Sequence, residues 1–194
     1  MMRSRVATTV VGLTLTATSL TLVATPSFAR TPSAKVISVF KISDPAIGAD
    51  GLLPAANTCD GAALSPALSF VGIPKGTKSV TVIMHGIPGP ARPGETEPSA
   101  HVYWTLYNLP ASTKAVAQGA TGGGTLGRNF KDNALAYTPP CSQGPGLKDY
   151  TITAYALSSR VGIEASSATR DSLIQAMKNS TLATSVLNIH YARP

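Results

Sequence analysis

Hydrophobic and polar residues alternate along several short segments of this 194-residue chain, and glycine and proline lie between the segments. Such alternation is typical of β-strands that are buried on one face. It is clearest in Asp149–Leu157, where Ile152, Ala154 and Ala156 occupy every second position. The pattern predicts strands at Val36–Ile42, Ser79–Ile87, His101–Leu109 and Asp149–Leu157, and a closing strand at Val186–Arg193.

One late segment follows a helical period instead. Leu173 and Met177 fall on the same face of a helix over Ser167–Ser180. Ser167 or Thr169 provides a side-chain oxygen that can cap its first turn. Many strands followed by one helix predict a mainly β domain, a sandwich or barrel with a helical appendage.

The segments between the predicted strands are rich in turn-forming residues. Pro88–Pro98 holds four prolines and two glycines and is predicted to be a loop. Within the glycine-rich Gly119–Asn133, the letters GGGTLG at Gly122–Gly127 match the formal pattern of a dinucleotide-binding loop. That loop requires a strand before it and a helix after it, and neither pattern is present. We therefore expect a flexible surface loop there and no nucleotide.

The first 29 residues have the pattern of an export signal. Arg3 and Arg5 precede an uncharged stretch rich in Val, Leu, Ala and Thr, which ends in Ser-Phe-Ala at Ala29. A basic start, an apolar centre and small residues at the cleavage site define a signal peptide. We predict a signal peptide at residues 1–29, a single domain at 30–194 and a secreted or periplasmic protein without a later transmembrane segment. An uncleaved membrane anchor is the alternative.

Two cysteines remain after that cleavage, Cys59 and Cys141. Export would place them in an oxidising compartment, where a pair of cysteines usually forms a disulfide. Two buried thiols or one reactive thiol are the alternatives. A zinc site is not predicted, because no cysteine or histidine stands at ligand spacing beside either residue.

The charge pattern and the histidines argue against several classes of function. The formal net charge is +7, but lysine and arginine are scattered, so nucleic-acid binding is not expected. The chain contains no G-x-S-x-G motif and no evident pair of carboxylates. Of the three histidines, His85 is the best functional candidate, because it enters the proline-rich loop. Neither a metal nor a cofactor is predicted.

Five blocks stand in order along the chain: CDGAALSPALSF at Cys59–Phe70, SVTVIMHGIPGP at Ser79–Pro90, YWTLYNLP at Tyr103–Pro110, YTPPC at Tyr137–Cys141 and GLKDYTITAYAL at Gly146–Leu157. In this order they resemble the phosphatidylethanolamine-binding protein family, in its bacterial Raf-kinase-inhibitor-like branch. The family blocks read C-D-G-x-N-x-S-P-x-L-x-W, D-P-D-A-P, H-W-x-x-x-N-I-P, Y-x-G-P-x-P and G-x-H-R-Y-x-F-x-x-Y-A-L. The resemblance implies an antiparallel β-sandwich with Greek-key connections and a C-terminal helix.

The resemblance also implies a small pocket for phosphate, acetate or a phospholipid head group, but this chain departs from the family at that pocket. Gly86–Pro90 replaces the acidic loop, and Tyr103 stands where the first pocket histidine belongs. Lys148 and Asp149 replace the His-Arg pair. We predict a shallow ligand pocket in which Lys148 supplies the charge, built from His85, Tyr103, Tyr137, Pro140, Lys148 and Tyr150. A pocket filled by Tyr103 is the alternative.

Three functional hypotheses follow from these residues. The first is an exported, non-enzymatic binding protein for an anionic small molecule or a phospholipid head group. The second is a protein-interaction or inhibitor module, similar to regulators of kinases or proteases, whose ancestral pocket is filled and whose contact surface is Pro88–Pro98. The third is an enzyme of unknown class, for which the sequence offers no general base with an evident partner.

Overall fold

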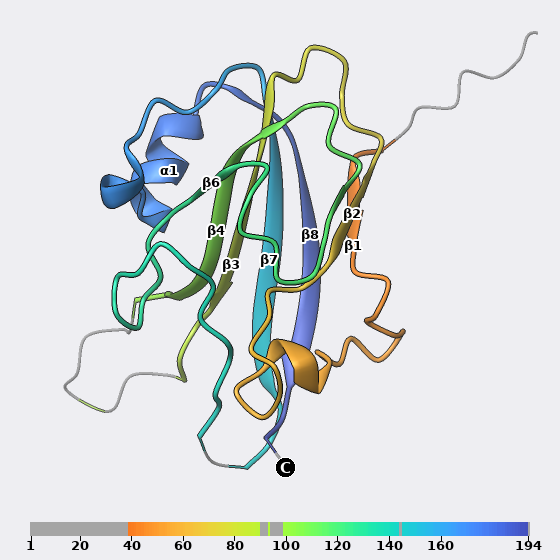
Figure 1. Cartoon of the computed structure of the whole chain (residues 1–194), viewed down its shortest axis with the longest axis vertical. Helices are drawn as coiled ribbons and strands as arrows, with labels where there is room; N and C mark the ends of the chain where they lie inside the picture. The colour runs from red at the N-terminus through yellow and green to blue at the C-terminus, as the bar shows by residue number, and fades with distance from the viewer. Residues whose placement is uncertain (1–38, 90–92, 94–98, 144, 194) are drawn as a thin grey trace, which may run out of the picture. The chain divides into compact units, whose positions relative to one another are not determined.

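Two antiparallel β-sheets form most of the chain that the computed structural model describes, which is residues 39–89, 93, 99–143 and 145–193 (Figure 1). The smaller sheet has the strand order β1-β2-β5, with β1 at Lys41–Ser43, β2 at Leu68–Val71 and β5 at Ala115–Val116. The larger sheet has the order β6-β4-β3-β7-β8, with β6 at Thr125–Leu126, β4 at His101–Pro110, β3 at Ser79–Gly86, β7 at Lys148–Leu157 and β8 at Thr181–Tyr191.

The predicted fold class, a mainly β domain of two antiparallel sheets with one C-terminal helix, is confirmed. Strands β3, β4 and β7 begin and end within one residue of their predicted bounds. The predicted strand at Val36–Ile42 begins outside the described residues, and β1 covers its end. β8 begins at Thr181, five residues before the predicted start, because its first residues pair with β7 without being strongly hydrophobic. β6 lies in Gly119–Asn133, which was predicted to be a loop, and its two residues are too few to form a pattern.

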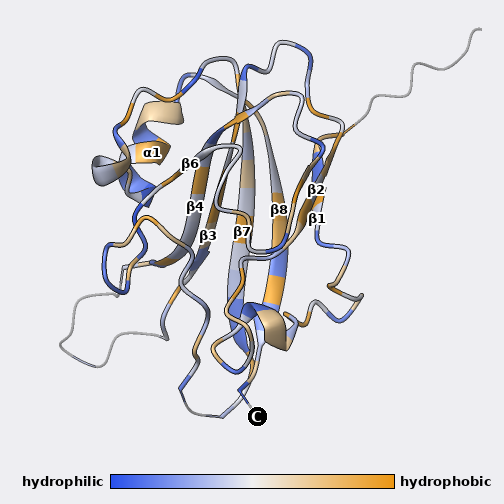
Figure 2. Ribbon diagram, viewed as in Figure 1, coloured by the Kyte–Doolittle hydropathy of each residue, from blue (hydrophilic) through white to orange (hydrophobic). Residues whose placement is uncertain are grey.

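The larger sheet is covered on both faces, which explains the continuous hydrophobic run of β3. Val82 and Met84 belong to the core between the two sheets. Ile83 belongs to a second core, on the opposite face, that includes Leu173 and Met177 of the helix. A strand buried on both faces favours apolar side chains at consecutive positions, as at Val82–Met84. β8 lies at the sheet edge, and its hydrophobic and polar colours alternate in Figure 2.

The helix α1 spans Arg170–Met177 and is shorter than the predicted Ser167–Ser180. Thr169 is its N-cap, and its hydroxyl accepts a hydrogen bond from the Ser172 backbone N–H at 3.2 Å. The Ser172 side chain in turn accepts from the Thr169 backbone N–H, which completes a capping box. Ala165–Ser167 forms a separate 3₁₀ turn. No helix of the described residues has the length and apolar character that a membrane span requires.

β4 contributes one more residue than β3 at two points, and each extra residue forms a bulge. Val80 pairs with Leu109 and Val82 with Leu106, so the first bulge contains Asn108. Asn108 has a left-handed backbone, with φ of 59°. Its side chain donates to the Val161 carbonyl at 2.9 Å and accepts from the Val161 N–H at 2.8 Å. The Asn108 side chain therefore satisfies both backbone groups of Val161, as a neighbouring strand would, and its left-handed backbone bends β4.

The disulfide predicted between Cys59 and Cys141 is confirmed, with 5.2 Å between their Cα atoms. The Cys59 backbone N–H also donates to the Pro140 carbonyl at 3.0 Å. The two cysteines are 82 residues apart, so the crosslink removes much conformational freedom from the unfolded chain. A loop of this size corresponds to about 4 kcal/mol of stabilisation in the chain-entropy model.

We predict that Asn108→Ala lowers the free energy of unfolding by about 2–4 kcal/mol. Alanine leaves the Val161 backbone groups without partners and is strained at a positive φ. Asn108→Gly loses the same hydrogen bonds but tolerates the backbone, so it should retain about 1 kcal/mol more than alanine. Equilibrium urea unfolding measures both. Equal losses in the two variants would contradict the strain at Asn108.

Candidate functional site

Three tyrosines gather where β3 ends and β7 begins, and we call Tyr103, Tyr137 and Tyr150 the tyrosine cluster. Tyr103 comes from β4, Tyr150 from β7 and Tyr137 from the segment after β6. The Tyr103 and Tyr150 rings meet edge to face, with 5.1 Å between their centroids. Tyr137 lies edge-on to Trp104 at 6.3 Å. These are favourable geometries for aromatic pairs, so the cluster is a packed part of the core.

The second bulge of β4 directs Tyr103 into this cluster. Met84 pairs with Trp104, but the next residue, His85, pairs with Val102, so Tyr103 is the extra residue. As a result, Tyr103 and Trp104 are consecutive, yet both belong to the core between the sheets. Regular alternation would have placed them on opposite faces. Only 8% of Tyr103 is exposed.

Gly86 lies against the same rings. A Cβ atom built at Gly86 would lie 2.9 Å from Cδ1 of Tyr150 and 3.3 Å from Cε2 of Tyr103. Gly86 stands where the family blocks have the first aspartate of D-P-D-A-P. The space into which that aspartate side chain would project is therefore occupied by the two tyrosine rings.

The cluster is electrically neutral at neutral pH. Burial raises the pKa of Tyr103, Tyr137 and Tyr150 above the usual value near 10. Repulsion between ionised phenols raises the pKa of Tyr137 and Tyr150 further. The Tyr137 hydroxyl already donates to the Asn57 carbonyl. The hydroxyls of Tyr103 and Tyr150 are hydrogen-bonded to each other. The cluster thus offers an anion no charge of its own, and its hydroxyls already have partners within the protein.

Lys148 and Pro140 border the cluster in different ways. Lys148 is the first residue of β7 and is exposed, and the alternation of β7 places it on the same face of the sheet as Tyr150. Pro140 is buried, and its carbonyl accepts the hydrogen bond from Cys59. Pro140 therefore holds the disulfide segment rather than lining an open space.

His85 lies on the opposite face of the larger sheet, so the structure does not bring it together with the other five predicted pocket residues. The reason is strand alternation: Met84 and Gly86 face the tyrosine cluster, and His85 between them faces away. Burial lowers the pKa of His85, and the nearby charge of Arg170 lowers it further. The alternation along Ser79–Gly86 was a signal from which this placement could have been predicted.

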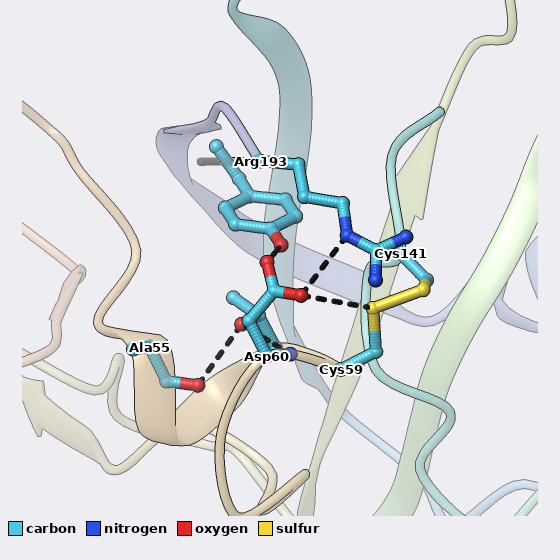
Figure 3. Close-up of polar contacts among 7 residues, drawn as sticks. Ala55, Cys59, Asp60, Cys141 and Arg193 are labelled. Carbon is cyan, nitrogen blue, oxygen red and sulfur yellow. Dashed lines mark hydrogen bonds and ion pairs between the residues drawn. A yellow bond between two sulfur atoms is a disulfide. The ribbon is translucent and has the colours of Figure 1, made fainter. Parts of the chain in front are cut away.

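Asp60 lies on an exposed turn, but its side chain is only 20% exposed and has partners that sequence reasoning missed (Figure 3). Its carboxylate accepts hydrogen bonds from the Tyr191 hydroxyl and, at 3.0 Å, from Nε of Arg193. Cys59 of the disulfide is its neighbour in the chain and is also in contact with the carboxylate, as Figure 3 shows. These partners lie more than 130 residues away along the chain, so no local pattern indicates them. Asp60 joins the C-terminal end of β8 to the disulfide segment.

Comparisons with known proteins give the same family as the five sequence blocks. The family model described as phosphatidylethanolamine-binding protein matches residues 43–192. A UPF0098 protein of Chlamydia trachomatis is 32% identical over 136 residues, which cover 70% of this chain and 87% of that protein. A UPF0098 protein of Chlamydia muridarum is 34% identical over the same length and the same shares of both chains.

Two crystal structures share the fold. The Chlamydia trachomatis protein CT736, a phosphatidylethanolamine-binding protein homologue, superposes with a TM-score of 0.72 at 28% identity, covering 80% of this chain and 99% of that one. Escherichia coli YbcL superposes with a TM-score of 0.68 at 22% identity, with the same coverage of both chains. By its sequence blocks, its family model and its relatives, this chain belongs to the phosphatidylethanolamine-binding protein family.

Proposed function

We propose that the protein is an exported, non-enzymatic binding protein that contacts a partner protein through the surface around the tyrosine cluster. In this proposal, the pocket implied by the family resemblance is closed by the protein's own side chains. The observation that carries it is the packing of the Tyr103 and Tyr150 rings against Gly86. Of the hypotheses from the sequence, the filled pocket fits this packing best.

An anion in the cluster would need both space and positive charge. The space beside Gly86 is taken by two rings, and the three hydroxyls are neutral. Lys148 carries the positive charge on this face, but it is exposed to water, where ion pairs contribute little. These facts favour a contact surface over an anion pocket at the tyrosine cluster.

Three exposed hydrophobic side chains stand beside the cluster in the chain, and we call Ile87, Leu135 and Leu147 the apolar rim. Ile87 follows Gly86 directly, Leu135 precedes Tyr137 by two residues and Leu147 precedes Tyr150 by three. Their exposed fractions are 65%, 43% and 61%. Exposed apolar side chains are typical of a protein contact, in which they are removed from water.

The chemistry of the cluster supports a role without catalysis. General base catalysis needs a group that accepts a proton near neutral pH. Because their pKa values are raised, Tyr103, Tyr137 and Tyr150 keep their phenol protons at neutral pH. A neutral phenol is a poor base. The cluster is therefore suited to packing and to contact.

Export is supported by two features. The first 29 residues carry the charge and hydrophobicity pattern of a signal peptide. The Cys59–Cys141 disulfide is the kind of bond that persists outside the reducing cytosol.

Closure of the pocket predicts that Gly86→Ala lowers the free energy of unfolding by about 1–3 kcal/mol, because the new methyl group would overlap Tyr150. Gly162→Ala is the matched control, since a Cβ there meets no atom within 4 Å. The control should be neutral or slightly stabilising. Urea unfolding compares the two variants. A Gly86→Ala protein as stable as the control would mean that the tyrosine rings do not close the pocket.

The contact surface is tested by charge substitutions in the apolar rim. Immobilised wild-type protein is expected to capture a partner from the extracytoplasmic protein fraction of the producing cells. Leu147→Asp or Ile87→Asp should weaken that capture at least tenfold, because a charge would be desolvated in the contact. Val71→Asp, at an exposed β2 position of the other sheet, should leave capture unchanged. Equal capture by all variants, or rim-dependent binding to phosphatidylethanolamine vesicles and to no protein, would overturn the proposal.

Export predicts that the protein recovered from outside the cytoplasm begins at Arg30. Mass spectrometry of the intact protein and of its N-terminal peptide measures this directly. Replacement of Ala29 by a large residue such as Phe should block cleavage, because the peptidase reads a small residue there. Recovery of the full-length chain from the cytoplasm alone would contradict export.

A further inference from the structure

A cavity of about 440 Å³ lies between the N-terminus of α1 and the segment that follows β6. Both elements lie on the same side of β4 in Figure 1. Val102 of β4 forms part of its wall, and this residue packs with the core beneath α1. The cavity is therefore on the helix-covered side of the larger sheet, whereas Gly86 faces the tyrosine cluster on the other side.

Two arginines line this cavity, and we call it the arginine cavity. Arg128 is held by two hydrogen bonds: its backbone N–H donates to the Ala168 carbonyl at 2.9 Å, and its side-chain Nε donates to the Ser166 carbonyl. The Nε contact fixes the plane of the guanidinium group and leaves its terminal nitrogens free to donate elsewhere. The two contacts thus orient Arg128 toward the cavity that it lines.

Arg170 is the first residue of α1, which is an unfavourable place for a cation because the helix N-terminus is itself positive. Its partner is Asp171 at 3.1 Å, whose side chain is 90% exposed, while that of Arg170 is only 30% exposed. An ion pair with so exposed a carboxylate contributes little. Arg128 and Arg170 therefore concentrate positive charge at one opening that Asp171 only partly compensates.

The side of the cavity nearer the sheet supplies no negative charge within the described residues. His85 lies close enough to Arg170 for that charge to lower its pKa, and burial lowers it too. The Nδ1 atom of His85 is buried without a hydrogen-bond partner among the described residues. Among the described residues that line the cavity, the exposed Asp171 is the one carboxylate beside the two arginines.

Phe130 gives the cavity one apolar wall. Its ring is stacked on His101, with 4.2 Å between the centroids and 7° between the planes. It is nevertheless 41% exposed. A cavity of this volume, with two arginines and one aromatic wall, has room for a small organic molecule.

We propose that the arginine cavity binds a small organic anion, with its phosphate or carboxylate oxygens between Arg128 and Arg170 and its apolar part against Phe130. Planar guanidinium groups form paired, charge-assisted hydrogen bonds with both kinds of oxyanion. Phe130 meets Tyr103 of the tyrosine cluster edge to face, with 4.9 Å between the ring centroids, so the two sites adjoin at this wall. The proposal does not depend on the function proposed for the tyrosine cluster.

Phenyl phosphate and inorganic phosphate are the probes, titrated into the wild-type protein by isothermal calorimetry and two-dimensional NMR. Phenyl phosphate should bind to a single saturable site, and its affinity should fall as the sodium chloride concentration increases. It should shift the amide signals of Asn129 and Thr169, which line the cavity, and not those of Tyr150. Inorganic phosphate should bind more weakly, because it makes no contact with Phe130.

Arg170→Gln is the decisive variant, because its only described side-chain partner is the exposed Asp171, so the fold should be unaffected. Loss of its charge should weaken phenyl phosphate binding about 10- to 100-fold. Lys148→Gln removes the same charge at the tyrosine cluster and should leave binding unchanged. Phe130→Ala should weaken phenyl phosphate but not inorganic phosphate.

Three results would overturn the proposal. They are the lack of saturable phenyl phosphate binding to the wild type, an Arg170→Gln affinity equal to that of the wild type, and equal affinities of the wild type for inorganic phosphate and phenyl phosphate. Loss of binding in Lys148→Gln, with Tyr150 signals shifted, would place the anion in the tyrosine cluster instead. That last result would also reject the closed pocket, whereas the first three leave the proposed protein contact intact.

Discussion

The register of β4 against β3 is the constraint on which both ends of this domain depend. β4 carries one extra residue at Tyr103 and another beside Asn108. The bulge at Asn108 is held by the two hydrogen bonds of Asn108 to the Val161 backbone, which also fixes the segment that leads to α1. The bulge at Tyr103 points its ring into the core beside Trp104. Without these two bulges, simple alternation would place different side chains at the tyrosine cluster.

Two departures from the family blocks, the glycine at Gly86 and the tyrosine at Tyr103, can be explained by one change of side-chain packing. An aspartate at Gly86 and a ring at Tyr103 would compete for the same space, since even a Cβ at Gly86 approaches both rings closely. Burying a carboxylate beside neutral phenols would also be costly without a cation close by. The absence of the acid and the presence of the tyrosine are therefore mutually consistent. A site that has lost both its space and its charge is better understood as a packed surface than as a weakened pocket.

The sequence predicted the elements that have strong patterns and missed those that depend on distant partners. β3, β4 and β7 were predictable because their hydrophobic residues repeat over eight to ten positions. β6 was not, because two residues paired with Leu106 and Tyr107 leave no period to detect. Within the site, Tyr103, Tyr137 and Tyr150 were identified by the family blocks, and the Cys59–Cys141 bond by the number of cysteines. The partners of Asp60 could not be predicted, because they come from the far end of the chain.

The placement of His85 shows how two adjacent residues of one strand can lie in different environments. His85 and Gly86 are neighbours in β3, and strand alternation directs them to opposite faces of the sheet. Gly86 faces a cluster of neutral, tightly packed rings, whereas His85 faces the charge of Arg170. The two faces share a backbone but not a dielectric environment, because one is packed with aromatic rings and the other borders a cavity. The tight packing around Gly86 on one face therefore coexists with the charged side chains beside α1 on the other.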